Sequence, residues 1–174
     1  MPTECTARDA LIGRRKQSRP AALCAVFTRE QTTLLFHSPT PGLARRLART
    51  FAKRLESEVT LGRPFTCLIA GDPQLRRLNR DFRQKDYATD VLSFPSRQNL
   101  GFLGDIAISF QHAERQAAEY GHGVGQEIEI LMLHGVLHLL GMDHEKDRGQ
   151  MARAENKWRA RFGLPRGLIR RVSE

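Results

Sequence analysis

The sequence predicts a single domain in which short β-strands alternate with amphipathic α-helices. Its 174 residues suit one domain. Hydrophobic residues make up 40% of the chain and charged residues 27%, which is ordinary for a soluble globular protein. Short runs of β-forming residues stand between segments with four-residue apolar spacing. No apolar run approaches the roughly 20 residues of a membrane-spanning helix, and the first twenty residues lack the apolar stretch of a secretory signal.

The N-terminal third is predicted to hold a basic arm, one or two strands and a basic helix. Residues 1–20 resemble a loosely ordered arm that ends at a proline, and residues 21–174 form the domain. The run 21–28 is a plausible strand, and 32–36 either pairs with it or connects onward. The dipeptide at 40–41, Thr-Pro, supplies an N-cap and a first-turn proline. The apolar stripe of the helix that follows is Leu43, Leu47, Phe51 and Leu55.

A second strand and a second basic helix follow. The strand covers 64–70, and Asp-Pro at 72–73 opens a helix that runs to about Arg83. Its predicted buried stripe is Leu75, Leu78 and Phe82. Arg76, Arg80 and Arg83 fall on a neighbouring face at i, i+4 and i+7, so their side chains project together.

Two more strands are predicted at 90–95 and 104–109, joined by a polar loop that contains glycine. The next helix should bury Phe110, Ala113, Ala117 and Tyr120. The glycines of "GHGVG", residues 121–125, lie between two helices rather than after a strand. They therefore indicate a helix C-cap and a turn, not a phosphate-binding loop.

The C-terminal part is predicted to hold a core helix and a final amphipathic helix. From Gln126 to Leu140 nearly every face is apolar, which is typical of a buried helix, and Gly141 ends it. Asp147, with Gln150 three residues later, resembles a capping box. The helix that it opens would bury Met151, Trp158 and Phe162, and Gly163 and Pro165 would stop it before a basic tail.

Charge and cysteine usage narrow the functional class. The net charge is +9, and residues 1–87 account for it with 17 Lys/Arg and 8 Asp/Glu, whereas residues 88–174 hold 11 of each. Such a concentrated positive field favours a polyanionic partner, most often nucleic acid. Cys5, Cys24 and Cys67 are odd in number and widely spaced, so we expect buried reduced thiols rather than disulfides or a metal pair.

Three of the six histidines fall within "HGVLHLLGMDH", residues 134–144. His134 and His138 are four apart on the predicted core helix, so their Cβ atoms should lie about 6 Å apart on one side. Gly141 permits the backbone reversal that brings His144 back toward the pair. Three imidazoles suit Zn²⁺ and leave a fourth coordination position for water, which is typical of a catalytic site.

The spacing also resembles the metzincin protease pattern HExxHxxGxxH, with one difference. Position 135 is glycine, where a zinc protease carries the glutamate that acts as general base. Peptide hydrolysis through a glutamate-activated water is therefore disfavoured. Asp143, Glu145 and Asp147 are alternative bases, although acidic residues just past a helix end are usually solvated or act as caps.

The histidine segment, "LNRDFRQKDYATDVLSFP" at 78–95 and "LGDIAIS" at 103–109 together resemble the YbeY family of bacterial zinc-dependent endoribonucleases. The match covers roughly residues 64–162. The resemblance implies an α+β fold, in which a small mixed sheet of about four strands is flanked by about five helices. It places zinc at the end of the central buried helix, held by His134, His138 and His144, and assigns the family's characteristic arginine to Arg83. Met142 stands where many relatives have tyrosine.

By this resemblance the protein is a cytoplasmic, single-strand-specific endoribonuclease of 16S ribosomal RNA 3′-end maturation and ribosome quality control. Its one zinc ion per chain would act with Arg83, and Arg76 and Arg80 would add RNA contacts. Ribosomal small-subunit or assembly partners are expected, and a membrane is not. Two alternatives stay open: a metalloprotease-like hydrolase, and a non-catalytic RNA-binding assembly factor with a structural metal. Three imidazoles also suit nickel or copper, and the sequence leaves both the attacking group and the general base open.

Overall fold

The computed structural model describes residues 31–96 and 101–165, so the predicted arm at 1–20, the strand at 21–28 and the basic tail lie outside it. The described residues form four strands and five α-helices. The strands are β1 (Thr33–Phe36), β2 (Thr66–Ala70), β3 (Val91–Pro95) and β4 (Gly104–Ser109). The helices are α2 (Gly42–Arg54), which continues into a π-helical segment η1 (Leu55–Val59), α3 (Asp72–Arg83), α4 (Phe110–Tyr120), α5 (Val124–Leu139) and α6 (Gln150–Phe162).

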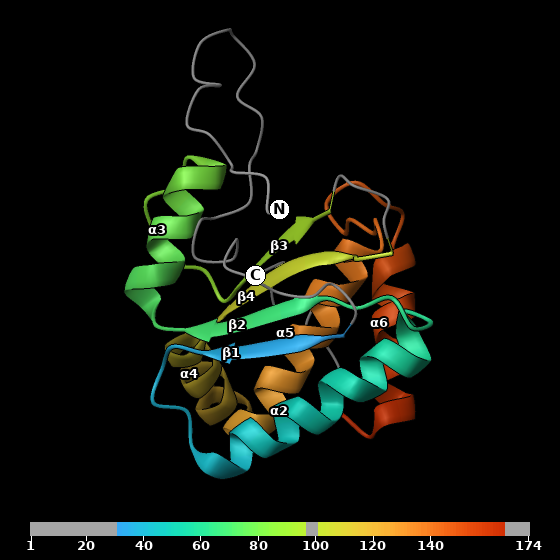
Figure 1. The fold of residues 1–174 in the computed structure, drawn as a ribbon, viewed down its shortest axis with the longest axis horizontal. Coiled ribbons are helices and arrows are strands. Elements are labelled where there is room, and N and C mark those ends of the chain that lie inside the picture. Colours follow the sequence, from blue (N-terminus) through green and yellow to red (C-terminus); the bar gives the residue numbers. More distant parts are fainter. Residues whose placement is uncertain (1–30, 97–100, 166–174) are drawn as a thin grey trace, which may run out of the picture.

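The four strands form one mixed sheet in the order β1-β2-β4-β3 (Figure 1). Strands β1, β2 and β4 are parallel, whereas β3 runs antiparallel to β4. Cys67 lies opposite Ile106, and Val91 lies opposite Ile108. Parallel neighbours need a crossover connection, and helix α2 makes it between β1 and β2. The predicted α+β fold with a small mixed sheet is confirmed.

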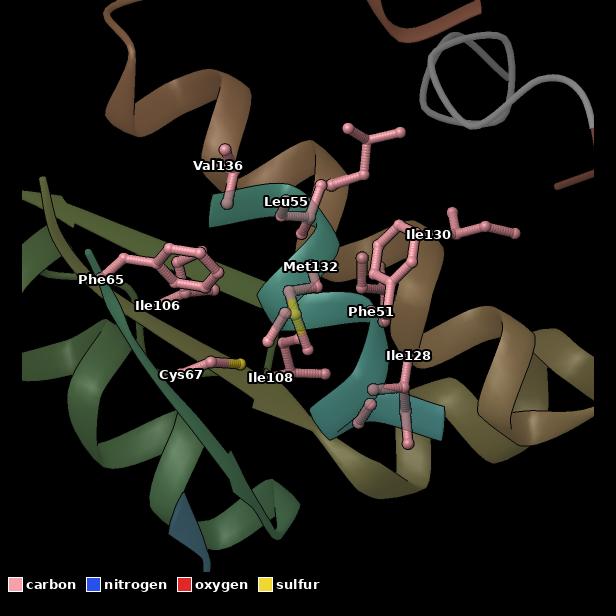
Figure 2. Close-up of a cluster of buried hydrophobic side chains, with 14 of the residues drawn as sticks. Phe51, Leu55, Phe65, Cys67, Ile106, Ile108, Ile128, Ile130, Met132 and Val136 are labelled. Carbon is pink, nitrogen blue, oxygen red and sulfur yellow. The ribbon is translucent and has the colours of Figure 1, made fainter. Parts of the chain in front are cut away.

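Each face of the sheet has its own layer of helices. Side chains alternate along a strand, so Cys67 and Ile69 enter the larger core cluster while Leu68 enters a smaller one on the other face. The larger cluster joins the sheet to α2 and α5 (Figure 2). The smaller cluster contains Leu75 and Leu78 of α3, which therefore covers the opposite face.

Helix α5 lies at the centre of the larger cluster (Figure 1). Side chains on all its faces are buried, including Ile128, Leu131 and Val136, as its apolar composition predicted. Cys67 is also buried, and burial raises the pKa of its thiol to about 12. No helix among the described residues is long and apolar enough to cross a membrane.

The predicted apolar stripe of α2 is half wrong. Leu43 is 61% exposed and Leu47 is 36% exposed. The two leucines are exposed because α2 lies very close to α5. A Cβ atom added at Gly125 of α5 would lie only 2.8 Å from Leu47 Cδ1. Only small residues fit between helices that lie so close together, so alanines of α2, rather than Leu43 and Leu47, are buried in the core. The buried residues of α2 are Ala44, Ala48, Phe51 and Ala52, followed by Leu55. Tyr120 of α4, also predicted to be buried, is 41% exposed.

Several helix starts differ by one or two residues from the prediction. The N-caps of α2 and α3 are Pro41 and Gly71, each one residue away from the predicted Thr40 and Asp72. Helix α6 begins at Gln150, yet Asp147 still acts from the loop, because its carboxylate accepts hydrogen bonds from backbone N–H groups of this helix start. The glycine turn before α5 is confirmed, with Gly121 in the left-handed conformation that ends α4.

Candidate metal centre

The three histidines of the sequence motif converge at the C-terminal end of α5. His134 and His138 lie on its last turns, and His144 comes from the loop that follows. One ligand nitrogen of each ring lies within 4.8 Å of the others. The Nε2 atoms of His134 and His138 are 3.1 Å apart. Two nitrogens bound to one tetrahedral zinc at about 2.0–2.1 Å would lie about 3.3 Å apart, so this pair fits a shared ion.

The turn after α5 returns the third histidine to the first two. Gly141 has φ of 89°, a left-handed conformation that favours glycine. Its N–H donates to the His138 carbonyl at 3.0 Å, and the N–H of Met142 donates to the Leu137 carbonyl at 3.1 Å. These bonds close the helix end, and the His144 ring centroid comes within 5.3 Å of both other rings.

A buried carboxylate from another helix orients His134. Glu155 of α6 lies 2.9 Å from His134 Nδ1 through its Oε2 atom, and both side chains are almost fully buried. The other carboxylate oxygen of Glu155 pairs with buried Arg159 at 2.6 Å. A carboxylate at Nδ1 favours the tautomer with the proton there, which leaves the Nε2 lone pair for a metal.

The prediction from sequence missed this pair of charges, although a signal was present. Met151, Glu155 and Arg159 follow one another at four-residue steps, so they share one face of α6. Met151 was correctly predicted to be buried, although Trp158 and Phe162, predicted to be buried with it, are only partly buried. A glutamate and an arginine on a buried stripe are rare unless they are paired, and that combination pointed to a buried polar partner on a neighbouring element.

His138 is held in the same tautomer by a backbone group. Its Nδ1 donates to the Met142 carbonyl at 2.9 Å, which leaves Nε2 facing His134. Burial, followed by the neighbouring His134 and His144, lowers the pKa of His138 to about 4. The ring is therefore neutral near pH 7, as metal ligation requires. Three imidazole nitrogens converging on one point fit a divalent transition metal.

Gly135 faces the sheet rather than the histidines. A Cβ atom added there would lie 2.8 Å from Ile106 Cγ2, and the Gly135 carbonyl accepts a hydrogen bond from Ser93 Oγ at 3.1 Å. The glutamate of a zinc protease has no room at this position.

The acidic residues of the loop after α5 have structural contacts. Asp143 pairs with Lys146 at 2.7 Å and Asp147 caps α6. These contacts match the structural roles that the sequence favoured for them.

The three arginines predicted to bind RNA all lie on α3, which covers the other face of the sheet from α5. Arg76 forms a bidentate pair with Asp86 at 2.9 and 2.7 Å. Arg80 lies 3.8 Å from the same carboxylate. Arg83 is exposed at the last turn of α3, and no ion pair holds it among the residues that the structure describes. Of the three, Arg83 is therefore the one whose guanidinium is free for a ligand.

Comparison with known proteins supplies the family. A family profile described as "Endoribonuclease YbeY" matches residues 27–163, which is most of the chain. The chain belongs to the YbeY family. The matched region contains all three sequence motifs and begins well before residue 64, where the resemblance in the sequence first became clear.

Several curated YbeY relatives are close in sequence. "Endoribonuclease YbeY" of Solibacter usitatus is 59% identical over 143 residues, which cover 82% of this chain and 96% of the relative. The protein of the same name from Koribacter versatilis is 43% identical over 133 residues, covering 76% and 87%. The solution structure of TM1509 from Thermotoga maritima superposes with a TM-score of 0.51 at 24% identity, covering 74% of this chain and 93% of that one. This last similarity supports the fold alone.

Proposed function

We propose that this protein is a zinc-dependent endoribonuclease that cleaves single-stranded RNA in the cytoplasm. Its proposed role is 16S ribosomal RNA 3′-end maturation and ribosome quality control, together with the small subunit or its assembly factors. The observation that carries the proposal is the convergence of three imidazoles in a member of a family named for endoribonuclease activity. The positive charge of residues 1–87 supports a polyanionic substrate.

In this proposal His134, His138 and His144 hold one Zn²⁺ per chain. A zinc ion at such a site supplies Lewis acidity and lowers the pKa of bound water toward neutrality. Glu155 and the Met142 carbonyl keep two of the rings turned toward the ion. Because their Nδ1 positions are occupied by these contacts, the rings need not reorganise when the metal binds.

The exposed guanidinium of Arg83 is proposed to bind a phosphate of the RNA. Guanidinium binds phosphate oxygens through two parallel hydrogen bonds and can balance the charge that develops on phosphorus. Arg76 and Arg80 are proposed as weaker contacts, because RNA would first have to compete with Asp86 for them. Replacing Arg83 should therefore reduce cleavage more than replacing Arg80.

Metal analysis and RNA cleavage by the purified protein test the proposal. Wild type should contain about one zinc per chain and cleave single-stranded RNA, whereas His134→Ala should lose both the metal and the activity. Arg83→Ala should keep the metal and lose most of the activity. Undiminished cleavage by both His134→Ala and Arg83→Ala would contradict the proposed mechanism. The product ends identify the attacking group, since a 2′,3′-cyclic phosphate shows attack by the ribose 2′-OH rather than by water.

The two alternatives have separate tests. Cleavage of casein with single-stranded RNA left intact would favour a protease, although Gly135 leaves no room for the usual base. A folded His138→Ala variant that binds RNA and restores growth of a deletion strain would favour a non-catalytic assembly factor.

A further inference from the structure

The outer face of helix α2 carries three exposed cations. Arg46, Arg49 and Lys53 recur at i, i+3 and i+7, so their side chains project together from the side opposite buried Ala48. Helix α2 contains no Asp or Glu. Within the described residues no carboxylate pairs with any of the three. We call Arg46, Arg49 and Lys53 the α2 cation stripe.

Among residues 31–96 and 101–165, no carboxylate balances the charge of this stripe. Arg49 lies three residues after Arg46 and four before Lys53, and like charges at these spacings destabilise a helix. Helix α3 differs, because Arg76 pairs with Asp86 and Arg77 pairs with Asp81. A stripe of like charges that costs stability and has no partner within the described part of the chain indicates an external one.

The other two basic residues of α2, Arg45 and Arg54, already contact groups of the protein. Within the part of the chain that the structure describes, the unpaired cations of this helix are therefore those of the stripe. Arg45 donates to the Thr40 carbonyl at 2.9 Å, and Arg54 contacts Glu58 at 3.3 Å. Arg49 lies over the ring of Phe36, with its guanidinium carbon 5.2 Å from the ring centroid. Stacking uses the flat face of the guanidinium, so the N–H donors in its plane stay available to an anion.

The position of α2 relates the stripe to the metal centre. Ala44 and Leu47, near the start of α2, contact Gly125, near the start of α5. At the other end of α2, Leu55 joins the core cluster that contains Val136 of α5 (Figure 2). Both ends of α2 therefore pack into the same core cluster as α5, the helix that carries His134 and His138. From Arg46 to Lys53 the stripe extends about 10 Å along the helix axis.

We propose that the α2 cation stripe binds the phosphate backbone of the RNA substrate outside the cleavage site. This inference rests on the proposed function and adds a second contact surface to it. A membrane fits less well, because the apolar face of α2 is buried against α5 and only Leu43 and Leu47 are exposed beside the stripe. An acidic protein surface is a different partner, and unchanged RNA binding by a stripe variant would leave it in place of RNA.

The test compares two triple variants with equal net charge. One is Arg46→Gln/Arg49→Gln/Lys53→Gln. The other, the control, is Arg148→Gln/Arg153→Gln/Lys157→Gln, which removes three exposed cations outside α2. Binding to a long and a short single-stranded RNA is measured at several salt concentrations in EDTA, which prevents cleavage. The short RNA spans only the cleavage site.

The stripe variant should bind the long RNA at least tenfold more weakly at low salt. Its slope of log affinity against log salt should fall by about 2 units, since each phosphate contact to a single strand contributes about 0.7. Binding of the short RNA should match wild type, and so should its cleavage in a separate assay with zinc and without EDTA. An unchanged slope, an equal loss in the control variant, or binding to anionic vesicles that only the stripe variant loses would each overturn the proposal. If wild type cleaves no RNA at all, the proposed function fails while the slope still measures the stripe.

Discussion

At the residue level, the metal centre depends on what each Nδ1 atom contacts. Glu155 accepts from His134, and the Met142 carbonyl accepts from His138. Both contacts leave Nε2 as the free nitrogen, and the two free atoms are 3.1 Å apart. Glu155 is in turn fixed by Arg159. The histidine rings are therefore oriented by α6 as well as by their own helix.

Glu155→Ala should lower zinc affinity by about 10–100-fold, the usual effect of losing such an orienting group. The physical reason is that His134 loses the contact that fixes its tautomer and ring orientation. Competition with a chromophoric chelator measures the affinity. Glu155→Gln should recover part of it, because the amide oxygen can still accept the Nδ1 proton. Exposed Glu145→Ala serves as the control, and equal affinities for all four proteins would contradict the role assigned to Glu155.

At the level of elements, the position of α5 against the sheet is set by glycine. A Cβ atom at position 135 would lie 2.8, 3.1 and 3.3 Å from three carbon atoms of Ile106. Gly125 plays the same part toward α2. Helix α5 therefore lies close to β4 at Gly135 and close to α2 at Gly125, because neither residue has a side chain.

Gly135→Ala should destabilise the protein by about 1–3 kcal/mol, the usual cost of overpacking a core. Although alanine favours helix, the contact with Ile106 should outweigh the gain of about 1 kcal/mol from propensity. Urea unfolding of the metal-free protein measures the free energy. Gly123→Ala is the matched control, since a Cβ there would meet only Gln126 Oε1, at 3.9 Å. A Gly135→Ala protein as stable as wild type would show that the helix can move off the sheet without cost.

At the level of the whole molecule, burying His138 makes folding depend on pH. The folded pKa of His138 is about 4, below the value of 6.5 expected for an exposed histidine, with burial as the main cause. Between these two values the unfolded chain binds more protons than the folded one, so acid favours unfolding. The contribution of His138 to the free energy of unfolding is therefore fully present above about pH 6.5 and is lost as the pH falls toward 4.

Metal-free wild type should therefore lose stability between pH 7.5 and pH 5, with His138 contributing on the order of 1 kcal/mol after allowance for its partial exposure. Urea unfolding at the two pH values measures the loss. His138→Gln should show a smaller loss, because glutamine does not titrate. If the two proteins lose the same free energy, His138 does not remain neutral in the folded state. Wild type with bound zinc should resist acid further, since a ligand bound only to the folded state stabilises it.

The accuracy of the sequence predictions differed between strands, helix faces and the site. Strand β4 was predicted with its observed bounds, because its β-forming residues are bordered by a polar loop and a helix cap. The prediction that Leu43 is buried was wrong, because a leucine enters the core only where the neighbouring helix leaves space for its side chain. The three histidines were found because they lie within eleven residues of each other along the chain. Glu155 was missed because its contact to His134 joins residues 21 positions apart.

The sequence by itself determined the family, the strand and helix order of the described residues and the three histidines that form the candidate metal centre. These follow from local spacing, since periodicity, caps and a short histidine motif act over a few residues. The tertiary structure alone decided which face of α2 is buried, why position 135 must be small, and how Glu155 orients His134. Those features depend on the distance between elements that are remote in the chain, and that distance is set by how all of the side chains pack together.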